Sequence, residues 1–174
     1  MLGGTFQIMN SSNYGEVNSG GSSGGIIGYV GGHAWDTNIS VSILNCANFG
    51  KINSQLRDGG GIIGLQGTTC TENYVSIKNT YNTGNVTGKT FGNIIGTISY
   101  ADGQTDTKTE FENVYYTEEP LLGKGSLTSG EATLKSQDEI KSQSFVDLLN
   151  QNIGENSDWK KWKLGEKGYP EIDL

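Results

Sequence analysis

The 174-residue sequence predicts an all-β protein, a parallel β-solenoid (β-helix) of about three to four coils with a short helical C-terminal cap. Three observations predict it: a motif that recurs at nearly constant spacing, short apolar runs between Gly and Asn, and 27 glycines. Glycine at this level without a Gly-X-Y period indicates many turns and excludes collagen. Charged residues make up only 18% of the chain, whereas disordered chains combine few apolar residues with high charge.

The first repeated motif is Asn-x-x-Asn-x-Gly followed by a polar residue and an apolar one. It reads NSSNYGEV at 10–17, NCANFGKI at 45–52 and NTYNTGNV at 79–86, and a degenerate fourth copy contains Asn113. The leading asparagines are 35, 34 and 34 residues apart. Helical repeats share such periods, but Gly, Asn and β-branched residues are poor helix formers, so short strands are expected.

A second motif follows the first in every repeat. GGIIG occurs at 24–28 and 60–64, and GNIIG at 92–96. Two motifs recurring in the same order predict a repeat region over 1–116, with units at approximately 6–44, 45–78 and 79–112. A unit of short strands cannot bury its apolar face alone, so stacking of units is expected.

Stacking would place equivalent residues of successive units next to one another. The expected apolar ladder is Ile8, Ile43, Ile77 and Phe111. The expected polar ladder, with a structural role, is Asn10, Asn45, Asn79 and Asn113. Asn side chains can hydrogen-bond to one another along such a column. Gly15, Gly50 and Gly84 follow at the turn, where we expect a positive φ that glycine tolerates.

The repeat pattern stops after Tyr116, and 117–174 is predicted to be a C-terminal cap with one helix. Ser136 is a candidate N-cap for a helix at 137–151, in which Ile140, Phe145, Leu148 and Leu149 fall near one face. Trp159, Trp162 and Tyr169 lie in the extended stretch that follows. Because an open repeat end exposes strand edges, we expect these aromatics to close the last coil.

The stretches NYGEV, NFGKI and NTGNV, together with GGIIG, make the chain resemble the GLUG repeats of bacterial surface and secreted proteins, including IgA-specific metallopeptidases. Ile replaces the Leu of that motif, and Asn93 replaces a Gly in the third copy. The resemblance implies a non-enzymatic β-solenoid at the cell surface. It does not imply peptidase activity, because the zinc motif His-Glu-x-x-His is absent and the sole histidine is His33. Since the chain starts inside a unit, we expect it to be the C-terminal part of a longer protein.

The charge and cysteine content exclude several classes of partner and cofactor. The net charge of −7 with a single arginine, Arg57, argues against nucleic acids and anionic membranes as partners. No apolar run is long enough to span a membrane. Cys46 and Cys70 are expected to be free thiols, with a disulfide between them as the alternative. The spacing of Cys and His predicts no metal site, and no cofactor is expected.

Three aromatic residues in the long connections that follow the IIG strands are candidate ligand-binding residues: Trp35, Tyr74 and Tyr100. Aromatic rings at a surface can stack on sugar rings or dock a protein partner. The alternative is that they only cover the flank of the repeats.

The sequence therefore predicts a non-catalytic structural or adhesive module of a bacterial cell-surface or secreted protein, with a host or bacterial surface glycan or protein as partner. One alternative is a carbohydrate-binding module. The other is a polysaccharide-acting β-helix enzyme, for which Asp36, Asp58, Asp102 and Asp106 would have to converge.

Overall fold

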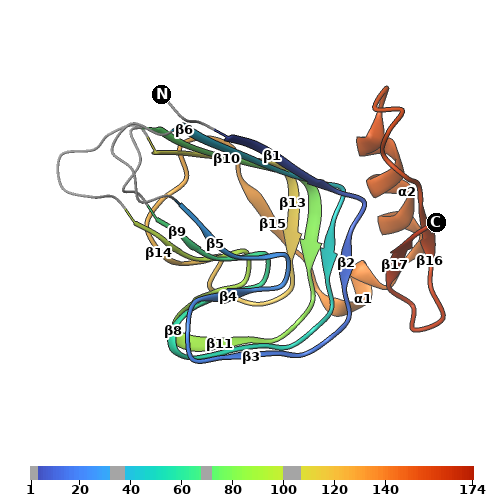
Figure 1. The fold of residues 1–174 in the computed structure, drawn as a ribbon. Helices are drawn as coiled ribbons and strands as arrows, with labels where there is room; N and C mark the ends of the chain where they lie inside the picture. The colour runs from blue at the N-terminus through green and yellow to red at the C-terminus, as the bar shows by residue number, and fades with distance from the viewer. Residues whose placement is uncertain (1–3, 32–37, 68–71, 100–106) are drawn as a thin grey trace.

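The computed structural model describes residues 4–31, 38–67, 72–99 and 107–174, and these residues are mostly β with few helices (Figure 1). The largest sheet, sheet A, is parallel and has the order β1-β6-β10-β13-β15, with β2 and β7 paired beside this path. Its strands are β1 Gly4–Met9, β2 Ser12–Asn13, β6 Asn38–Leu44, β7 Ala47–Asn48, β10 Glu72–Asn82, β13 Thr107–Tyr116 and β15 Ala132–Leu134.

Two smaller parallel sheets and one antiparallel pair complete the described strands. Sheet B consists of β3 Val17–Ser19, β4 Ser23–Gly24, β8 Ile52–Gly60 and β11 Val86–Gly92. Sheet C consists of β5 Ile27–Val30, β9 Ile63–Gln66, β12 Ile95–Ile98 and β14 Leu122–Lys124. Sheet D pairs β16 Trp162–Leu164 with β17 Pro170–Ile172.

Equivalent positions of successive repeats pair in register within these sheets. In sheet A, Ile8 pairs with Ile43, Ile43 with Ile77, and Ile77 with Phe111. In sheet C, Ile27 pairs with Ile63 and Ile63 with Ile95. The constant spacing in the sequence thus reports strand pairing between repeats.

The predicted fold class, a parallel β-solenoid with an end cap, is wrong. The sheet topology shows several separate parallel sheets of unequal size and an antiparallel pair, so the fold is described by its sheets and not as a solenoid. The physical reason is that each repeat turns sharply at the second Asn of its motif and the Gly two residues later. This turn ends sheet A before sheet B begins. Strand lengths also vary widely, from two residues in β2 to 11 in β10.

The apolar core lies between the inward faces of sheets A and C. Ile43 and Ile77 come from sheet A, Ile63 and Ile95 come from sheet C, and all four are fully buried. Burial of each such side chain contributes about 1.5–3 kcal/mol, so the stacked isoleucines are the main apolar contribution to this core.

The predicted helix at 137–151 is two helices, α1 Gln137–Ile140 and α2 Gln143–Ile153. The prediction that Ser136 is the N-cap of the first helix is confirmed, since Ser136 and Glu139 form a capping box. The break arises at Ser142, whose Oγ accepts a hydrogen bond from the backbone N–H of Phe145 (3.2 Å) and caps a second helix. Within the described residues, neither helix is long and apolar enough to cross a membrane.

Residues 136–174 lie beside the repeats, at the corner formed by Asn10, Asn45 and Asn79 (Figure 1), whereas β14 and β15 pair with β12 and β13 of the last repeat. An apolar cluster joins Tyr81 and Tyr115 of sheet A to Phe145, Leu149 and Trp162. The Tyr81 hydroxyl also donates to the carbonyl oxygen of Pro170. The expectation that the aromatics close the last coil is therefore corrected: they pack along several repeats at once.

Candidate functional site

The predicted asparagine ladder lies at the corner that the C-terminal segment covers. Asn10, Asn45, Asn79 and Asn113 all have positive φ, between 45° and 55°. The Asn79 amide donates to Asn45 Oδ1 and the Asn45 amide to Asn10 Oδ1, both at 2.8 Å. Asn113 is exposed, and the place it would take beside Asn79 Oδ1 is occupied by the amide of Asn152 on α2 (3.2 Å).

This asparagine column positions the C-terminal segment. Trp162 Nε1 donates to Asn45 Oδ1 (2.6 Å), and the Asn45 amide also donates to the carbonyl of Lys160 (2.9 Å). At the first repeat, the Asn10 amide donates to the carbonyl of Asp158 (2.8 Å). The column therefore fixes residues 158–162 against the asparagine corner of sheet A.

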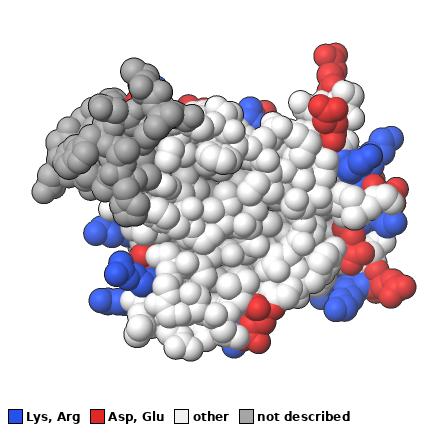
Figure 2. Space-filling view, in the orientation of Figure 1, with Lys and Arg blue, Asp and Glu red and all other residues white. Residues whose placement is uncertain are grey.

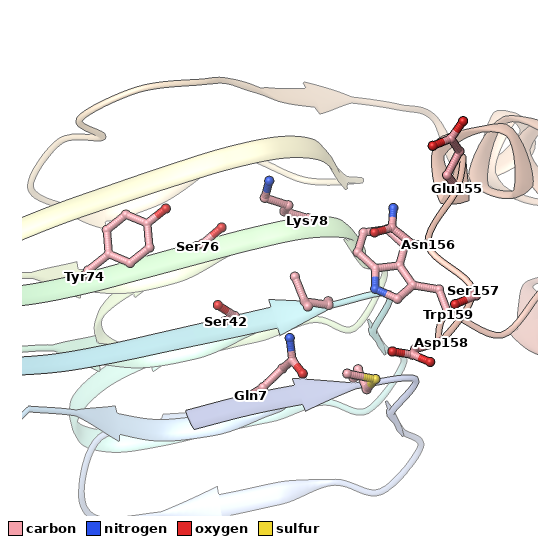
Figure 3. Close-up of a pocket in the computed structure, with 12 residues that line it drawn as sticks. Gln7, Ser42, Tyr74, Ser76, Lys78, Glu155, Asn156, Ser157, Asp158 and Trp159 are labelled. Atoms are coloured by element: carbon pink, nitrogen blue, oxygen red, sulfur yellow. The ribbon is translucent and has the colours of Figure 1, made fainter. Parts of the chain in front are cut away.

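A groove of about 520 Å³ forms where residues 155–159 meet the outer face of sheet A (Figure 3). Its floor consists of outward-pointing residues of β1, β6 and β10 in two rows that follow the strand register. One row is Gln7, Ser42 and Ser76; the other is Met9, Leu44 and Lys78. Because parallel strands lie about 4.8 Å apart, each row presents side chains at a regular spacing.

The wall of the groove is the turn between α2 and sheet D. Glu155, Asn156, Ser157, Asp158 and Trp159 line it, and Figure 3 shows the Trp159 ring beside the ends of the strands. The backbone N–H of Trp159 donates to the carbonyl of Asn156 (3.1 Å), which closes this turn and sets the position of the ring. The half-buried Trp159 adds an aromatic surface to a groove that Met9, Leu44 and a majority of polar residues line.

Tyr74 connects this groove to a second hollow of about 260 Å³, which Glu72, Tyr74, Lys108 and Glu110 line. The Tyr74 hydroxyl donates to Glu110 Oε2 (2.8 Å). That hydrogen bond and partial burial raise the pKa of Tyr74, so its ring is held in the neutral form. The two hollows follow one another across the strands of sheet A and could hold an extended ligand.

Among the described residues that line the groove, the one cation is Lys78, and it is already paired. Lys78 Nζ forms an ion pair with Glu112 (2.7 Å), and this hydrogen-bonded contact raises the pKa of Lys78. Both side chains are substantially exposed, so the pair contributes little to stability. The groove consequently presents hydroxyl, amide, carboxylate and aromatic groups, since Glu155 and Asp158 also line it.

Of the three predicted ligand-binding aromatics, the structure places Tyr74 in the groove. Trp35 and Tyr100 lie outside the described residues, as do His33 and Cys70. Sequence reasoning missed Trp159, which it assigned to the cap, and the polar row of Gln7, Ser42 and Ser76. The signal for that row was available, because the three residues stand one place before Ile8, Ile43 and Ile77.

One of the four aspartates that a polysaccharide-acting enzyme would need lies among the described residues. Asp58 accepts hydrogen bonds from Ser22 (3.1 Å) and Thr97 (2.6 Å), while Asp36, Asp102 and Asp106 lie outside the described residues. In the described part of the chain, no three His, Cys, Asp or Glu side chains gather as a metal site would require. Burial raises the pKa of the Cys46 thiol to about 11, which keeps it in the unreactive protonated form.

Comparisons with known proteins add one structural likeness. No protein-family model matches the chain and no curated protein matches it in sequence, so the GLUG resemblance stays a prediction. The chain is similar in structure to a protein from Bacteroides ovatus named "putative immunoglobulin A1 protease", with a TM-score of 0.54 and 20% identity. The match covers 96% of this chain but 57% of that one, and at this identity it shows a shared fold alone.

Proposed function

We propose that this chain is a non-catalytic adhesive module of a bacterial secreted or cell-surface protein, and that the groove on sheet A holds its ligand. The observation that carries the proposal is the groove itself. Trp159 supplies an aromatic surface next to a row of polar side chains in register, Gln7, Ser42 and Ser76. The chain matches 57% of the length of the structurally similar bacterial protein, which supports a role as one module of a longer protein.

The groove favours a carbohydrate as the ligand. Sugars present apolar C–H faces that pack on aromatic rings and hydroxyls that hydrogen-bond to amide, hydroxyl and carboxylate groups. Trp159 and Tyr74 provide rings, while Gln7, Ser42 and Asp158 provide polar groups along the same hollow. A regular spacing of about 4.8 Å between strands suits an extended chain of sugars that runs across the sheet.

The non-catalytic part of the proposal rests on how the described carboxylates of sheet A are engaged. Glu110 accepts the Tyr74 hydroxyl, and Glu112 is paired with Lys78, so neither is presented as a free acid or base. Glu155 and Asp158 line the groove wall and are the carboxylates that a catalytic role would have to use. The name of the structural neighbour raises peptidase activity as the competing function. Incubation of the chain with immunoglobulin A1 tests this, because any specific cleavage would contradict the proposal.

Binding is tested on an array of bacterial and host-type oligosaccharides with the unchanged chain, Trp159→Ala and Gln7→Ala. Loss of the indole surface should weaken binding to the best glycan about two- to tenfold, since one aromatic contact contributes about 0.5–1.5 kcal/mol. Leu56→Ala is the matched control, because Leu56 is 70% exposed on β8 of sheet B, away from the groove.

Thermal unfolding of each variant separates lost binding from lost folding. The proposal holds if Trp159→Ala and Gln7→Ala bind more weakly while they keep a cooperative unfolding transition. Glycan binding that Leu56→Ala weakens as much as Trp159→Ala, or no binding to any array component, would refute the groove as the carbohydrate site.

A further inference from the structure

In the first repeat, one edge of each parallel sheet has no neighbouring strand among the described residues. Among the described residues, β1 pairs only with β6, β3 only with β8, and β5 only with β9. We call the surface that these three strands form the N-terminal face. It is turned toward the viewer in Figure 2, where charged side chains lie around the rim and the centre is uncharged.

The apolar columns of the core run out onto this face. Ile8 and Ile27 are only partly buried, whereas their partners in the next repeat, Ile43 and Ile63, are fully buried. A hollow of about 340 Å³ lies between β1 and β5 over these side chains. The N-terminal face is therefore shaped like an interior layer of the molecule, although no described residue covers it.

The glycines at the repeat turn show how closely the turns of successive repeats approach one another. A Cβ added to Gly50 would overlap the carbonyl oxygen of Gly15, and one added to Gly84 would overlap that of Gly50. At these two positions only glycine leaves room for the turn of the preceding repeat. Gly15 has no described atom in the corresponding place: its nearest neighbour to an added Cβ is its own repeat's Asn13 side chain, at 3.7 Å. Its φ is not positive either, so nothing described requires glycine at 15.

The polar and aromatic columns next to Gly15 also end with one partner missing. Asn48 Oδ1 accepts the Asn13 amide (2.8 Å), and Asn82 Oδ1 accepts the Asn48 amide (2.7 Å). Among the described residues, Asn13 Oδ1 receives a hydrogen bond only from its own Gly15 N–H (3.1 Å). Tyr14 stacks on Phe49 with ring centroids 4.7 Å apart and is 58% exposed, so its other face is open.

The face lacks the charged and proline residues by which many sheet edges avoid unwanted pairing. Natural edges carry Lys, Pro or inward-pointing charges. Residues 4–31 contain no Lys, Arg or Pro, and Glu16 is their single charged residue. Glu16 is itself paired with Lys51 of the next repeat (3.5 Å). Such an edge is suited to a partner strand.

We propose that the N-terminal face docks one more β-repeat of the same Asn-x-x-Asn-x-Gly pattern, parallel and in register with the first. The docked Asn amide donates to Asn13 Oδ1, and an aromatic or planar group covers the open face of Tyr14. The docked turn places its glycine carbonyl over Gly15, as Gly15 itself does over Gly50. Each of sheets A, B and C gains a strand, and Ile8 and Ile27 become buried.

The test uses a chain in which a second copy of residues 4–38 is inserted directly before Gly4. Docking should raise the melting temperature and slow amide exchange in β1 by about tenfold or more, because edge amides become hydrogen-bonded. The variant that isolates docking is Gly15→Ala. In the unextended chain it meets no close neighbour and should leave the melting temperature unchanged. In the extended chain it should abolish the added protection, because its Cβ meets the docked carbonyl.

Gly20→Ala is the matched control. A Cβ at Gly20 has nothing within 4 Å, and the corresponding residue of the next repeat is Gln55, so a side chain is accommodated there. It should leave both chains unaffected. An added copy that stays unprotected, or a Gly15→Ala effect of equal size in both chains, overturns the proposal. Dimerisation of the unextended chain that Gly15→Ala abolishes also overturns it, because the face would then pair with a second copy.

Discussion

At the scale of the residue, asparagine and not glycine adopts the positive φ at the repeat corner, contrary to the sequence-based expectation. The sequence predicted positive φ at Gly15, Gly50 and Gly84, whereas the structure shows it at the leading asparagines. Asn tolerates the left-handed region better than most residues, and here its amide also hydrogen-bonds between repeats. The glycines are needed for the close approach of a neighbouring carbonyl.

Replacement of Asn45 tests the asparagine column. Asn45 is fully buried and exchanges hydrogen bonds with Asn10, Asn79, Lys160 and Trp162. Asn45→Gly keeps the positive φ but removes these four hydrogen bonds and deprives the buried Trp162 Nε1–H of its acceptor, so the free energy of unfolding should fall by about 2–3 kcal/mol. Asn45→Ala adds backbone strain and should cost about 1 kcal/mol more. Urea unfolding followed by circular dichroism measures both.

Asn113→Gly is the control for the column. Asn113 has the same backbone conformation, with φ of 55°, but is exposed and is not part of the hydrogen-bonded column. We expect a change within about 0.5 kcal/mol, as at ordinary surface sites. Equal losses at positions 45 and 113 would mean that the interrepeat hydrogen bonds contribute nothing.

At the scale of the element, side-chain caps decide where the C-terminal helices begin. The apolar spacing predicts one helix because Ile140, Phe145, Leu148 and Leu149 lie near one face. Periodicity does not report the competition at Ser142, whose Oγ accepts from Phe145 N–H and donates to the carbonyl of Glu139 (2.6 Å). Those two hydrogen bonds end α1 and start α2.

Ser142→Ala should destabilise the protein by about 1 kcal/mol, because α2 loses its N-cap. Gln151→Ala serves as the control, since Gln151 is exposed on the same helix and alanine favours helix. Chemical denaturation of the two variants gives the comparison. If Ser142→Ala is as stable as the unchanged chain, the cap is not what holds α2, and its packing against Tyr81 and Tyr115 alone determines it.

At the scale of the whole molecule, the C-terminal segment acts as a lateral brace across several repeats. Its hydrogen bonds reach the first repeat at Asn10, the second at Asn45 and the third at Asn79. Residues after 116 also add β14 and β15 to sheets C and A. The division into 1–116 and 117–174 stays a prediction, and the shared core implies that the two parts unfold together.

Calorimetry on the unchanged chain should therefore show one transition. Trp162→Ala removes a buried ring and its bond to Asn45, so it should destabilise the whole chain by about 3–5 kcal/mol. Trp162→Phe keeps an aromatic ring and should lose less. Two separate transitions, with sheets A, B and C melting independently of α2 and sheet D, would show that the segment is an independent unit.

The sequence by itself determined the repeat period, the residues that pair between repeats, the apolar columns and the N-cap at Ser136, because these depend on spacing and on local backbone chemistry. It also named Tyr74, whose role in binding stays a proposal. Only the tertiary structure decided that the strands form separate sheets, that the C-terminal segment lies along the asparagine corner, and that Trp159 meets Gln7, Ser42 and Ser76 in one groove. The last two facts depend on contacts between residues about 70–150 positions apart, which packing and side-chain hydrogen bonds select and which no local pattern encodes.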